Sequence, residues 1–494
     1  MNVASPAVNP LRDRIPATRD LLIGGQFASP QGERWPVYNP ASEEVIATVG
    51  GASAEQVDAA VAAARAAFPG WAGLSGDERS RHLHRLADVL GQAADELLPS
   101  IVNEVGTPVS VAAFLQVRMA VEYHLRWAAD AARVDRTQHL GPWSDPVPAM
   151  SDVVLEPAGV VAAITGYNYP LNLAIFKFGA ALAAGCTVVL LPSPRTPLTT
   201  LFLGELIRRA DLPPGVMNVI TGNAGVGRQL SSHPGVDRVS FTGSDAVGAM
   251  IMAQAAQRLT GVTLELGGKS PSIVLPGADV GQVAVETHLR WSRNGGQGCA
   301  ALARLLVHES LYEEFLAASE PAFRPMVVGD PWHPATNIGP MIRPDHQARV
   351  QGFVDDSLAA GGRKLLEVTE PLPARGWFVN PVLLGDLPPD ARAVQQEIFG
   401  PVAVILPFKD TDEAIRLAND TPYGLAANIW CGDNLAEGRR VAGQIRAGTV
   451  WINGGGAMRP DAPFGGYGRS GIGRELGEWG MREYLEVKHI QWRV

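Results

Sequence analysis

The feature that most constrains the fold is a regular alternation of strand-like and helix-like segments between residues 160 and 268. Short apolar runs such as VVAAI (160–164) and TVVLL (187–191) alternate with longer segments whose apolar residues recur at helical spacing. This alternation is typical of a parallel sheet with helices on both faces, which binds ligands where loops leave the carboxyl ends of the strands. The pattern predicts strands at 160–164, 187–191, 216–221, 238–243 and 262–268, and helices at 170–184, 198–210, 225–232 and 245–257.

Further elements are predicted on both sides of this region. Residues 1–20 are rich in proline and polar residues, and we expect them to form a loose arm. Residues 483–494 alternate well enough to form a strand, and a terminal strand with an open edge often pairs with another subunit. Before residue 160 we expect strands within 21–27 and 35–50 and helices at 54–68, 76–98 and 108–132. After residue 270 we expect a second α/β run, with helices at 280–293, 310–320 and 345–360 and strands at 304–308, 402–408 and 426–431.

Composition excludes several classes of protein. The chain has 494 residues, enough for two to four domains, and its formal net charge of −9 argues against a nucleic-acid or anionic-membrane partner, because both require a basic face. Its three cysteines include no CxxC pair, so we expect no disulfide framework, no metal site and a reducing cytoplasm. The amino terminus lacks the apolar core of a secretory signal, and no apolar run reaches the length of a membrane span.

One literal GxGxxG occurs, at Gly466, Gly468 and Gly471. A dinucleotide-binding fingerprint of this kind requires a preceding strand inside a βαβ unit. This motif lacks the strand and lies far from the alternating region, so we interpret it as a glycine-rich turn.

Three residues have side chains suited to nucleophilic catalysis. Cys299, in NGGQGCAALAR, is surrounded by glycines that allow close approach of a ligand, although a lone cysteine is more often a small buried hydrophobe. Glu265 closes the predicted strand VTLELGG, where it can act as a general base or merely cap a loop. Asn168, in TGYNYP, can donate to an oxyanion or simply favour the turn before Pro170.

Eight motifs in series give these residues a common context. They are GYNYPLNL, FTGS, LELGGKSP, GQGCAALAR, QEIFGPV, TPYGL, GTVWIN and APFGGYGRSGIGRELGE. In this order they resemble the aldehyde dehydrogenase superfamily, and the similarity covers nearly the whole chain. The NYPLNLA segment and the RxxD step before PFGG further resemble the non-phosphorylating glyceraldehyde-3-phosphate, lactaldehyde and semialdehyde-type members.

The resemblance implies a three-part α/β architecture. A Rossmann-like open parallel sheet forms an NAD(P)-binding domain from residues 1–132 and 154–265, and a second α/β domain at 266–460 is catalytic. A small β flap from residues 133–153 and 478–494 mediates oligomerisation, because family members are homodimers or homotetramers.

The resemblance also assigns catalytic roles. Cys299 attacks the aldehyde, the Asn168 amide and the Cys299 backbone N–H hold the oxyanion, and Glu265 activates water to hydrolyse the thioester. Lys177 and Glu475 match positions that the family uses as a proton relay, although a buried Lys–Glu pair can equally be structural.

For the cofactor, NAD or NADP, the resemblance places a phosphate at a helix start, flanked by loop residues. The implied cofactor-binding residues are Thr165, Gly166, Tyr167, Ser193, Arg195, Gly222, Gly225, Phe241, Thr242, Gly243, Ser244, Leu266, Gly267, Glu397 and Phe399. Taken alone, Glu397 is also compatible with a solvated surface charge.

Two departures from the family pattern affect this assignment. Leu191 and Pro194 replace the Lys and Glu that usually hold the adenosine ribose, and the adjacent Arg195 is suited to a 2′-phosphate or to a solvated loop. Either cofactor is therefore compatible with the sequence. Gly468 stands where PFGGxK places a lysine, and the sequence offers no functional interpretation of that change.

The resemblance implies a small-molecule aldehyde as substrate, bordered by Tyr167, Arg459 and Phe464. Arg459 is suited to an aldehyde with a carboxylate or phosphate, but it can equally pair with Asp461 or line a subunit contact. Aromatic side chains instead favour apolar aldehydes. Rival interpretations are coenzyme A acylation, a non-catalytic member of the fold, and a cofactor-independent thiol esterase.

Overall fold

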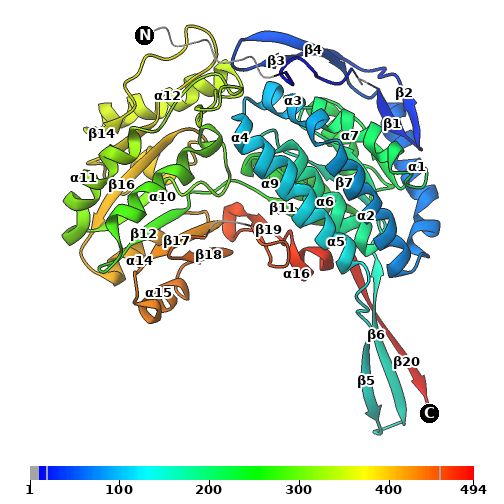
Figure 1. Ribbon diagram of the computed structural model, residues 1–494. Helices are drawn as coiled ribbons and strands as arrows, with labels where there is room; N and C mark the ends of the chain where they lie inside the picture. Colours follow the sequence, from blue (N-terminus) through cyan, green and yellow to red (C-terminus); the bar gives the residue numbers. More distant parts are fainter. Residues whose placement is uncertain (1–9, 18–19, 456–457) are drawn as a thin grey trace.

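Two large sheets and a small projecting sheet organise the chain, as Figure 1 shows. The computed structural model describes residues 10–17, 20–455 and 458–494. Residues 1–9 and 18–19 of the predicted arm and cofactor domain, and residues 456–457 of the predicted catalytic domain, lie outside the described residues.

The first large sheet has eight strands and contains the predicted βαβ region. Its order is β19 (Gly471–Ile472), β11 (Gly261–Glu265), β10 (Arg238–Thr242), β7 (Val160–Ile164), β8 (Thr187–Leu191), β9 (Met217–Val219), β1 (Leu21–Ile23) and β2 (Gln26–Ala28). The five strands from β11 to β9 are parallel, whereas β19, β1 and β2 extend the sheet by antiparallel pairing. Strands β7 and β8 have the predicted bounds, which confirms the core of the sequence interpretation.

Alternate residues of one strand enter two different hydrophobic cores. Val161 and Ala163 of β7 belong to a core with the helices of one face, and Val160, Ala162 and Ile164 to a core with those of the other. This period of two, with both faces covered, explains why the strand is apolar throughout. The first core involves α2 (Gly76–Gln92), α3 (Ala94–Val105), η1 (Ala112–Leu125), α5 (Arg126–Ala131), α6 (Pro170–Ala184) and α7 (Leu198–Arg209). The second involves α1 (Ala54–Ala72), α8 (Ala224–Ser232) and α9 (Asp245–Ala256).

Two predicted helices proved more complex. The predicted helix 76–98 is two helices, because the backbone turns at Ala93 (φ −90°, ψ 15°) and so points the almost fully buried α3 in a new direction. The predicted helix 108–132 comprises α4 (Val109–Val111), the wide-turned η1 and α5. Helical periodicity in the sequence does not distinguish these turn types, because the core contacts select them.

The second large sheet, on the left in Figure 1, has seven strands. Its order is β14 (Arg363–Glu367), β15 (Val382–Gly385), β16 (Val402–Phe408), β13 (Arg304–His308), β12 (Pro271–Val274), β17 (Ala426–Trp430) and β18 (Thr449–Ile452), parallel except for β14 with β15. Its helical segments are α10 (Val280–Ser292), η2 (Arg293–Gly296), η3 (Glu309–Leu311), α11 (Tyr312–Phe323), α12 (Pro344–Ala359), α13 (Arg392–Gln395), α14 (Thr411–Asn419) and α15 (Leu435–Ala442). Strands β12, β14, β15 and β18 and helices α13, α14 and α15 were not predicted.

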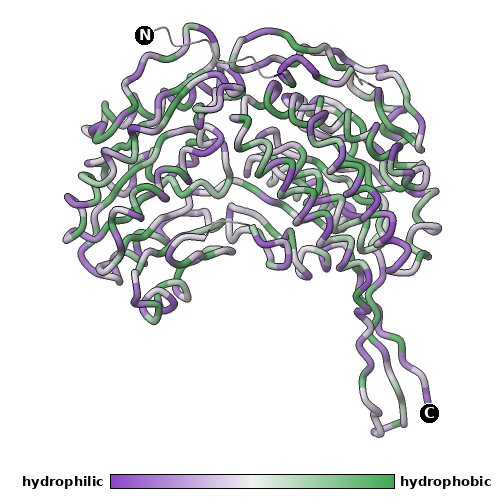
Figure 2. The backbone as a smooth tube through the Cα atoms, in the orientation of Figure 1, coloured by the Kyte–Doolittle hydropathy of each residue, from purple (hydrophilic) through white to green (hydrophobic). Residues whose placement is uncertain are grey.

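The third sheet projects from the rest of the molecule (Figure 1). It contains β20 (Leu485–Arg493), β6 (Ala149–Pro157) and β5 (Gln138–Trp143), so the predicted terminal strand is confirmed and pairs along its whole length with β6. Figure 2 shows hydrophobic and hydrophilic stretches along it, and Trp143, Val487 and Trp492 are exposed. The remaining elements are a hairpin of β3 (Arg34–Asn39) and β4 (Glu44–Gly50), together with η4 (Gly468–Ser470) and α16 (Gly477–Arg482). None of the helices in the described part of the chain combines the length and apolar character needed to cross a membrane.

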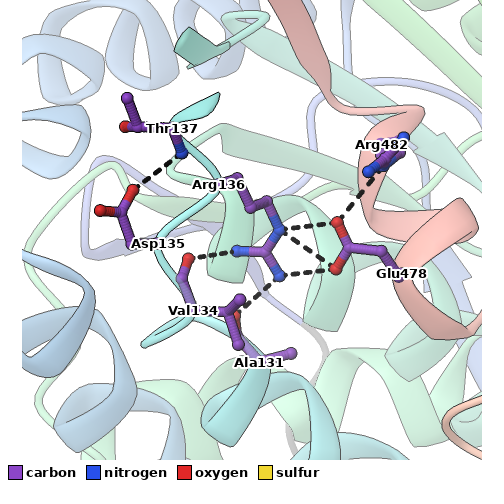
Figure 3. Close-up of polar contacts among 7 residues, drawn as sticks. All are labelled: Ala131, Val134, Asp135, Arg136, Thr137, Glu478 and Arg482. Atoms are coloured by element: carbon purple, nitrogen blue, oxygen red, sulfur yellow. Dashed lines mark hydrogen bonds and ion pairs between the residues drawn. The ribbon is translucent and has the colours of Figure 1, made fainter. Parts of the chain in front are cut away.

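A cluster of charge-assisted hydrogen bonds joins the base of this projecting sheet to α16, as drawn in Figure 3. The Arg136 guanidinium donates to both carboxylate oxygens of Glu478, with distances of 2.9 to 3.1 Å, and to the backbone carbonyls of Ala131 and Val134. Arg482 adds one weaker bond to Glu478, at 3.4 Å. Arg136 therefore ties together the chain segments that enter β5 and β20.

We expect Arg136→Ala to lower the free energy of unfolding by about 1–2 kcal/mol, because it removes the shorter hydrogen bonds to Glu478 and the guanidinium bonds to two carbonyls in a partly exposed setting. The matched control is Arg482→Ala, which removes only the 3.4 Å bond of a largely exposed side chain and should change little. Denaturant unfolding measures both. Equal effects of the two substitutions would contradict this account.

Candidate active site

A cavity of about 1430 Å³ lies where the carboxyl ends of the parallel strands β7, β8, β10 and β11 meet the loops of the seven-stranded sheet. This is the edge of a parallel sheet at which ligands bind. The predicted residues that line it are Thr165, Gly166, Tyr167, Asn168, Ser193, Arg195, Gly222, Phe241, Thr242, Gly243, Ser244, Glu265, Leu266, Gly267, Cys299, Glu397, Phe399, Arg459, Phe464 and Glu475. Lys177 lies behind the wall, bonded to Glu475, and the N–H of Gly225 bonds Asn223 at the start of α8.

The loop that carries Cys299 follows an unusual backbone path. Asn294, Gly295 and Gly296 adopt φ values of 55°, 63° and 70° in succession, which ends the helical segment and turns the chain toward the cavity. At Gly296 the backbone lies so close to the next loop that a Cβ would be 2.1 Å from the Gly400 carbonyl oxygen. Glycine is therefore required there by both conformation and space.

Gln297 fixes the position of this loop. Its side-chain amide donates to the carbonyls of Asn294 and Pro340, at 3.2 and 3.0 Å, and its side-chain oxygen accepts from Ile342 N–H and the Tyr167 hydroxyl. Its backbone carbonyl accepts a 2.8 Å hydrogen bond from Asn168 Nδ2. Asn168 is thereby bonded to the residue two positions before Cys299. Among the described residues, the second N–H of its side-chain amide makes no hydrogen bond.

The electrostatics around Cys299 favour the neutral thiol. Cys299 is half-buried, and burial, followed by the carboxylates of Glu265 and Glu397, raises its pKa to about 12. Glu265 ends β11 and is buried, and neither carboxylate oxygen has a hydrogen-bond partner among the described residues. Burial, with the neighbouring Glu475, raises the pKa of Glu265 well above its usual range, while the charge of Lys177 opposes that shift. A nucleophilic Cys299 accordingly requires a base, and Glu265 is an unpartnered carboxylate lining the same cavity.

Behind Glu265 lies a fully buried polar network. Lys177 Nζ, in α6, donates to Glu475 Oε1 at 2.5 Å and to Ser240 Oγ at 3.1 Å, and the Tyr484 hydroxyl donates to the same Ser240 oxygen. The backbone of Glu475 exchanges two 2.7 Å hydrogen bonds with Phe464. The structure thus brings together the predicted Lys177–Glu475 pair and joins it to the wall of the cavity.

The wall formed by β7, β8, β10 and α9 fits a dinucleotide. Helix α9 has twelve residues and points its amino end, capped by Ser244, at the cavity, which suits a phosphate. Asp245 in its first turn would repel an anion, but Arg469 pairs with it at 2.8 Å. The hydroxyls of Thr165 and Thr242 are buried without a partner among the described residues, so both have capacity for a ligand.

Glu397 lines the cavity from the loop between α13 and β16 of the seven-stranded sheet. Its Oε1 accepts a 3.1 Å hydrogen bond from Gly268 N–H, and a Cβ at Gly267 would lie 2.2 Å from Oε2, so a larger residue there would displace the Glu397 carboxylate. Burial raises the pKa of Glu397 to about 7. The interpretation of Glu397 as a solvated surface charge is therefore wrong.

The two predicted ligand-binding arginines are both engaged within the chain. Arg195 lies over the Tyr167 ring at 5.4 Å and within 3.9 Å of Asp345. Arg459 makes 2.6 and 2.9 Å bonds with Asp461 and is largely exposed, which was the alternative that the sequence allowed. Both still line the cavity.

Several residues of the site carried no recognisable sequence signal. Arg349 and His346, both in α12, bind the carbonyls of Glu397, Ile398 and Phe399 and so hold the Glu397 loop. Gln297 lies inside the quoted Cys299 motif, where the sequence assigned it no role, and Arg293 precedes that motif by one residue. Gly468 lies in a tight turn (φ 57°), where a Cβ would be 2.7 Å from the Pro422 carbonyl oxygen, so its space and conformation require glycine. The three GxGxxG glycines fall outside the residues that line the cavity.

We expect Gly296→Ala to lower the free energy of unfolding by at least about 2 kcal/mol, because a positive φ and a backbone overlap are both penalised. Gly298→Ala is the matched control, since its Cβ would meet nothing nearer than the Tyr169 hydroxyl at 3.9 Å. Thermal or denaturant unfolding compares the two variants. Comparable stabilities would show that the loop relaxes away from Gly400.

Comparison with known proteins identifies this arrangement. A family model described as the aldehyde dehydrogenase family matches residues 27–490. The chain is 38% identical over 484 residues to the chloroplastic betaine aldehyde dehydrogenase of Beta vulgaris, covering 96% of each protein. It is 39% identical over 479 residues to the 3-succinoylsemialdehyde-pyridine dehydrogenase of a Pseudomonas species, covering 96% of this chain and 98% of that protein. An NAD+ complex of an aldehyde dehydrogenase from Bacillus cereus superposes with a TM-score of 0.94 at 36% identity over 99% of both chains. The chain therefore belongs to the aldehyde dehydrogenase family.

Proposed function

We propose that the protein oxidises an aldehyde to the carboxylic acid with NAD+ or NADP+, using Cys299 as the nucleophile and Glu265 as the base. The observation that carries this proposal is the convergence of Cys299, Glu265 and Asn168 on one cavity whose opposite wall fits a dinucleotide. The bound NAD+ in the Bacillus cereus neighbour supports the cofactor class.

The residues act in sequence on the substrate. The Cys299 sulfur attacks the carbonyl carbon and forms a C–S bond, while Glu265 takes the thiol proton. The Asn168 amide and the Cys299 backbone N–H stabilise the oxyanion. Bound nicotinamide supplies the hydride acceptor, and the carbon is left as a thioester on Cys299. Once Glu265 has passed the thiol proton to solvent, it removes a proton from water, whose oxygen attacks the thioester carbon. The C–S bond breaks, the carboxylic acid leaves, and Glu265 returns its proton to the Cys299 sulfur.

Lys177 and Glu475 extend this proton path in our proposal. Their buried bond lies next to Glu265, and the charges of both act on its pKa. The alternative is a purely structural pair, since a buried Lys–Glu pair can persist without a catalytic role.

The architecture supports separate functions for three parts of the chain. We assign cofactor binding to residues 1–132 and 154–265, catalysis to 266–460, and oligomerisation to 133–153 with 478–494. The projecting sheet supports the last assignment, because β5 and β20 leave open edges and exposed apolar side chains such as Trp143 and Val487. We accordingly propose a homodimer or homotetramer, located in the cytoplasm on the grounds of cysteine usage.

Two alternative functions use the same cavity. Transfer of the acyl group to coenzyme A would not require a base for water, and the unpartnered Glu265 carboxylate favours hydrolysis instead. A non-catalytic role would give no reason for Cys299 and Glu265 to line the same cavity. Absorbance of reduced nicotinamide across an aldehyde panel, with Cys299→Ala as control, tests the proposal: signal from the wild type alone supports it, and no signal from folded wild type overturns it.

The pH dependence should follow from the raised pKa of Glu265. A base works only when ionised, so kcat/KM should fall as the pH drops through a value well above the usual carboxylate pKa of about 4.3. Glu265→Gln should lose about 100-fold or more in rate and also lose this acid limb. Steady-state rates across pH measure both. A limb that persists in Glu265→Gln would assign the base to another group.

Cofactor choice should depend on the turn after β8. Pro194→Glu places a carboxylate beside Arg195, which should repel a 2′-phosphate and raise the ratio of kcat/KM for NAD+ over NADP+ by about 10-fold. Pro194→Gln is the control, because it makes the same backbone change without the charge. Equal ratios in the two variants would place the adenosine ribose elsewhere.

A further inference from the structure

The glycine-rich turn at residues 466–471 joins the two large sheets, although none of its residues lines the cavity. Ser470 is fully buried, and its hydroxyl donates to the Gly267 carbonyl at 2.7 Å and accepts from Gly424 N–H at 3.0 Å. Gly267 lies just after β11 of the eight-stranded sheet, and Gly424 just before β17 of the seven-stranded sheet. The turn is therefore fixed to both halves of the molecule.

Arg469 is the only charged residue of this turn, and it pairs with Asp245 of α9. Its Nε and Nη2 atoms donate to Asp245 Oδ2 at 2.9 and 2.8 Å. The hydroxyl of Tyr423, from the segment before β17, donates to the same oxygen at 3.4 Å. Burial, followed by the charge of Asp245, raises the pKa of Tyr423 to about 12, so this hydroxyl keeps its proton at neutral pH. Both donors to Asp245 thus come from outside the βαβ region.

Asp245 is the first residue of α9, where its charge acts on the cavity. Ser244 before it and Val247 after it line the cavity. Its Oδ1 accepts the Ala246 N–H at 2.8 Å, so the carboxylate already occupies one of the donors of the first turn. Burial is the main cause of the raised pKa of Glu397, and the charge of Asp245 adds to it. The carboxylate is therefore close enough to influence a group inside the cavity.

Two observations indicate that an anion binds at this end of α9. The amino end of a twelve-residue helix attracts negative charge, and it faces the cavity. Thr242, two residues before the capping Ser244, is only 8% exposed and lines the cavity with a hydroxyl that has no partner among the described residues. The pyrophosphate of a dinucleotide suits both features. An uncompensated carboxylate in the first turn would oppose its binding, because like charges repel strongly at short range.

We propose that Arg469 completes the phosphate-binding end of α9 by neutralising Asp245, so that the pyrophosphate of the cofactor can bind there. This rests on the proposed function and adds a positioning residue to it. Arg469 does not line the cavity, so it acts through Asp245 and not by touching the cofactor. The phosphate site is then built from both halves of the molecule, with the helix in one and the compensating cation on the glycine-rich turn.

Calorimetric titration with NAD+ and with NADP+ tests the proposal without relying on turnover. Arg469→Gln leaves the charge of Asp245 uncompensated and should raise the Kd of the better-bound cofactor about 3- to 10-fold. The KM for that cofactor should rise by a similar factor, while kcat at saturation stays within about 2-fold. Raising NaCl from about 0.05 to about 0.5 M should reduce the difference from wild type, because salt screens a partly exposed charge.

A charge-neutral double variant separates neutralisation from a structural role. Asp245→Asn alone removes the repulsion and should bind the cofactor at least as tightly as wild type. Combining Asp245→Asn with Arg469→Gln should return Kd to within about 2-fold of wild type, although the ion pair is lost. Arg469→Lys keeps the charge and should recover most of the affinity.

Arg440→Gln is the matched control for the change in net charge. Arg440 is exposed and pairs with Glu437 through two bonds of 2.8 Å, and neither residue lines the cavity. Its Kd should stay within about 2-fold of wild type. Because exposed ion pairs contribute little to stability, all these variants should keep the unfolding midpoint of the wild type without cofactor.

The outcomes separate this proposal from the broader one. A double variant that binds as weakly as Arg469→Gln overturns the proposal, because Arg469 would then act only by holding the turn in place. Equal Kd values for wild type and Arg469→Gln overturn it too, while the proposed function stands. If folded wild type binds neither NAD+ nor NADP+, the proposed function itself fails.

Discussion

The close approach of two backbone segments, Gly296 and Gly400, is the constraint on which the site depends. Three consecutive residues with positive φ turn the chain at the end of α10, and glycine alone lets that turn lie against the Gly400 carbonyl. Cys299 is on one of these segments and Glu397 on the other. Their contact therefore fixes Cys299 relative to the side of the cavity suited to the cofactor, through backbone and not through flexible side chains.

Hydrogen bonds from Gln297, within the Cys299 loop, and from two residues of α12 hold this contact in place. Gln297 uses its amide and its carbonyl to join the Cys299 loop to Pro340, Ile342, Tyr167 and Asn168. Arg349 and His346 bind the carbonyls of the Glu397 loop from α12. Burial lowers the pKa of His346 to about 4, so it remains neutral and its role is that of a hydrogen-bonding support.

The buried carboxylates explain why the cavity favours neutral groups in the absence of ligands. Burial raises the pKa of Cys299, Glu265 and Glu397 together, and the carboxylates also raise that of the thiol. Perturbed pKa values of this kind, in groups that line one cavity, are typical of sites of acid–base chemistry. Lys177 opposes the shift of Glu265 and is compensated by Glu475.

The sequence by itself determined the alternating core and the family, and it nominated Cys299, Glu265 and Asn168 as site residues, because strand and helix periodicity and short motifs are local properties. β7, β8 and α6 were predicted to the residue. Only the tertiary structure chose the Asp461 pairing of Arg459 from the alternatives that the sequence allowed, and only it showed that Gln297 anchors the Cys299 loop and that α12 holds the Glu397 loop. The contacts of Gln297 with Pro340 and of α12 with the Glu397 loop join residues that are distant in the sequence, so no local pattern reveals them.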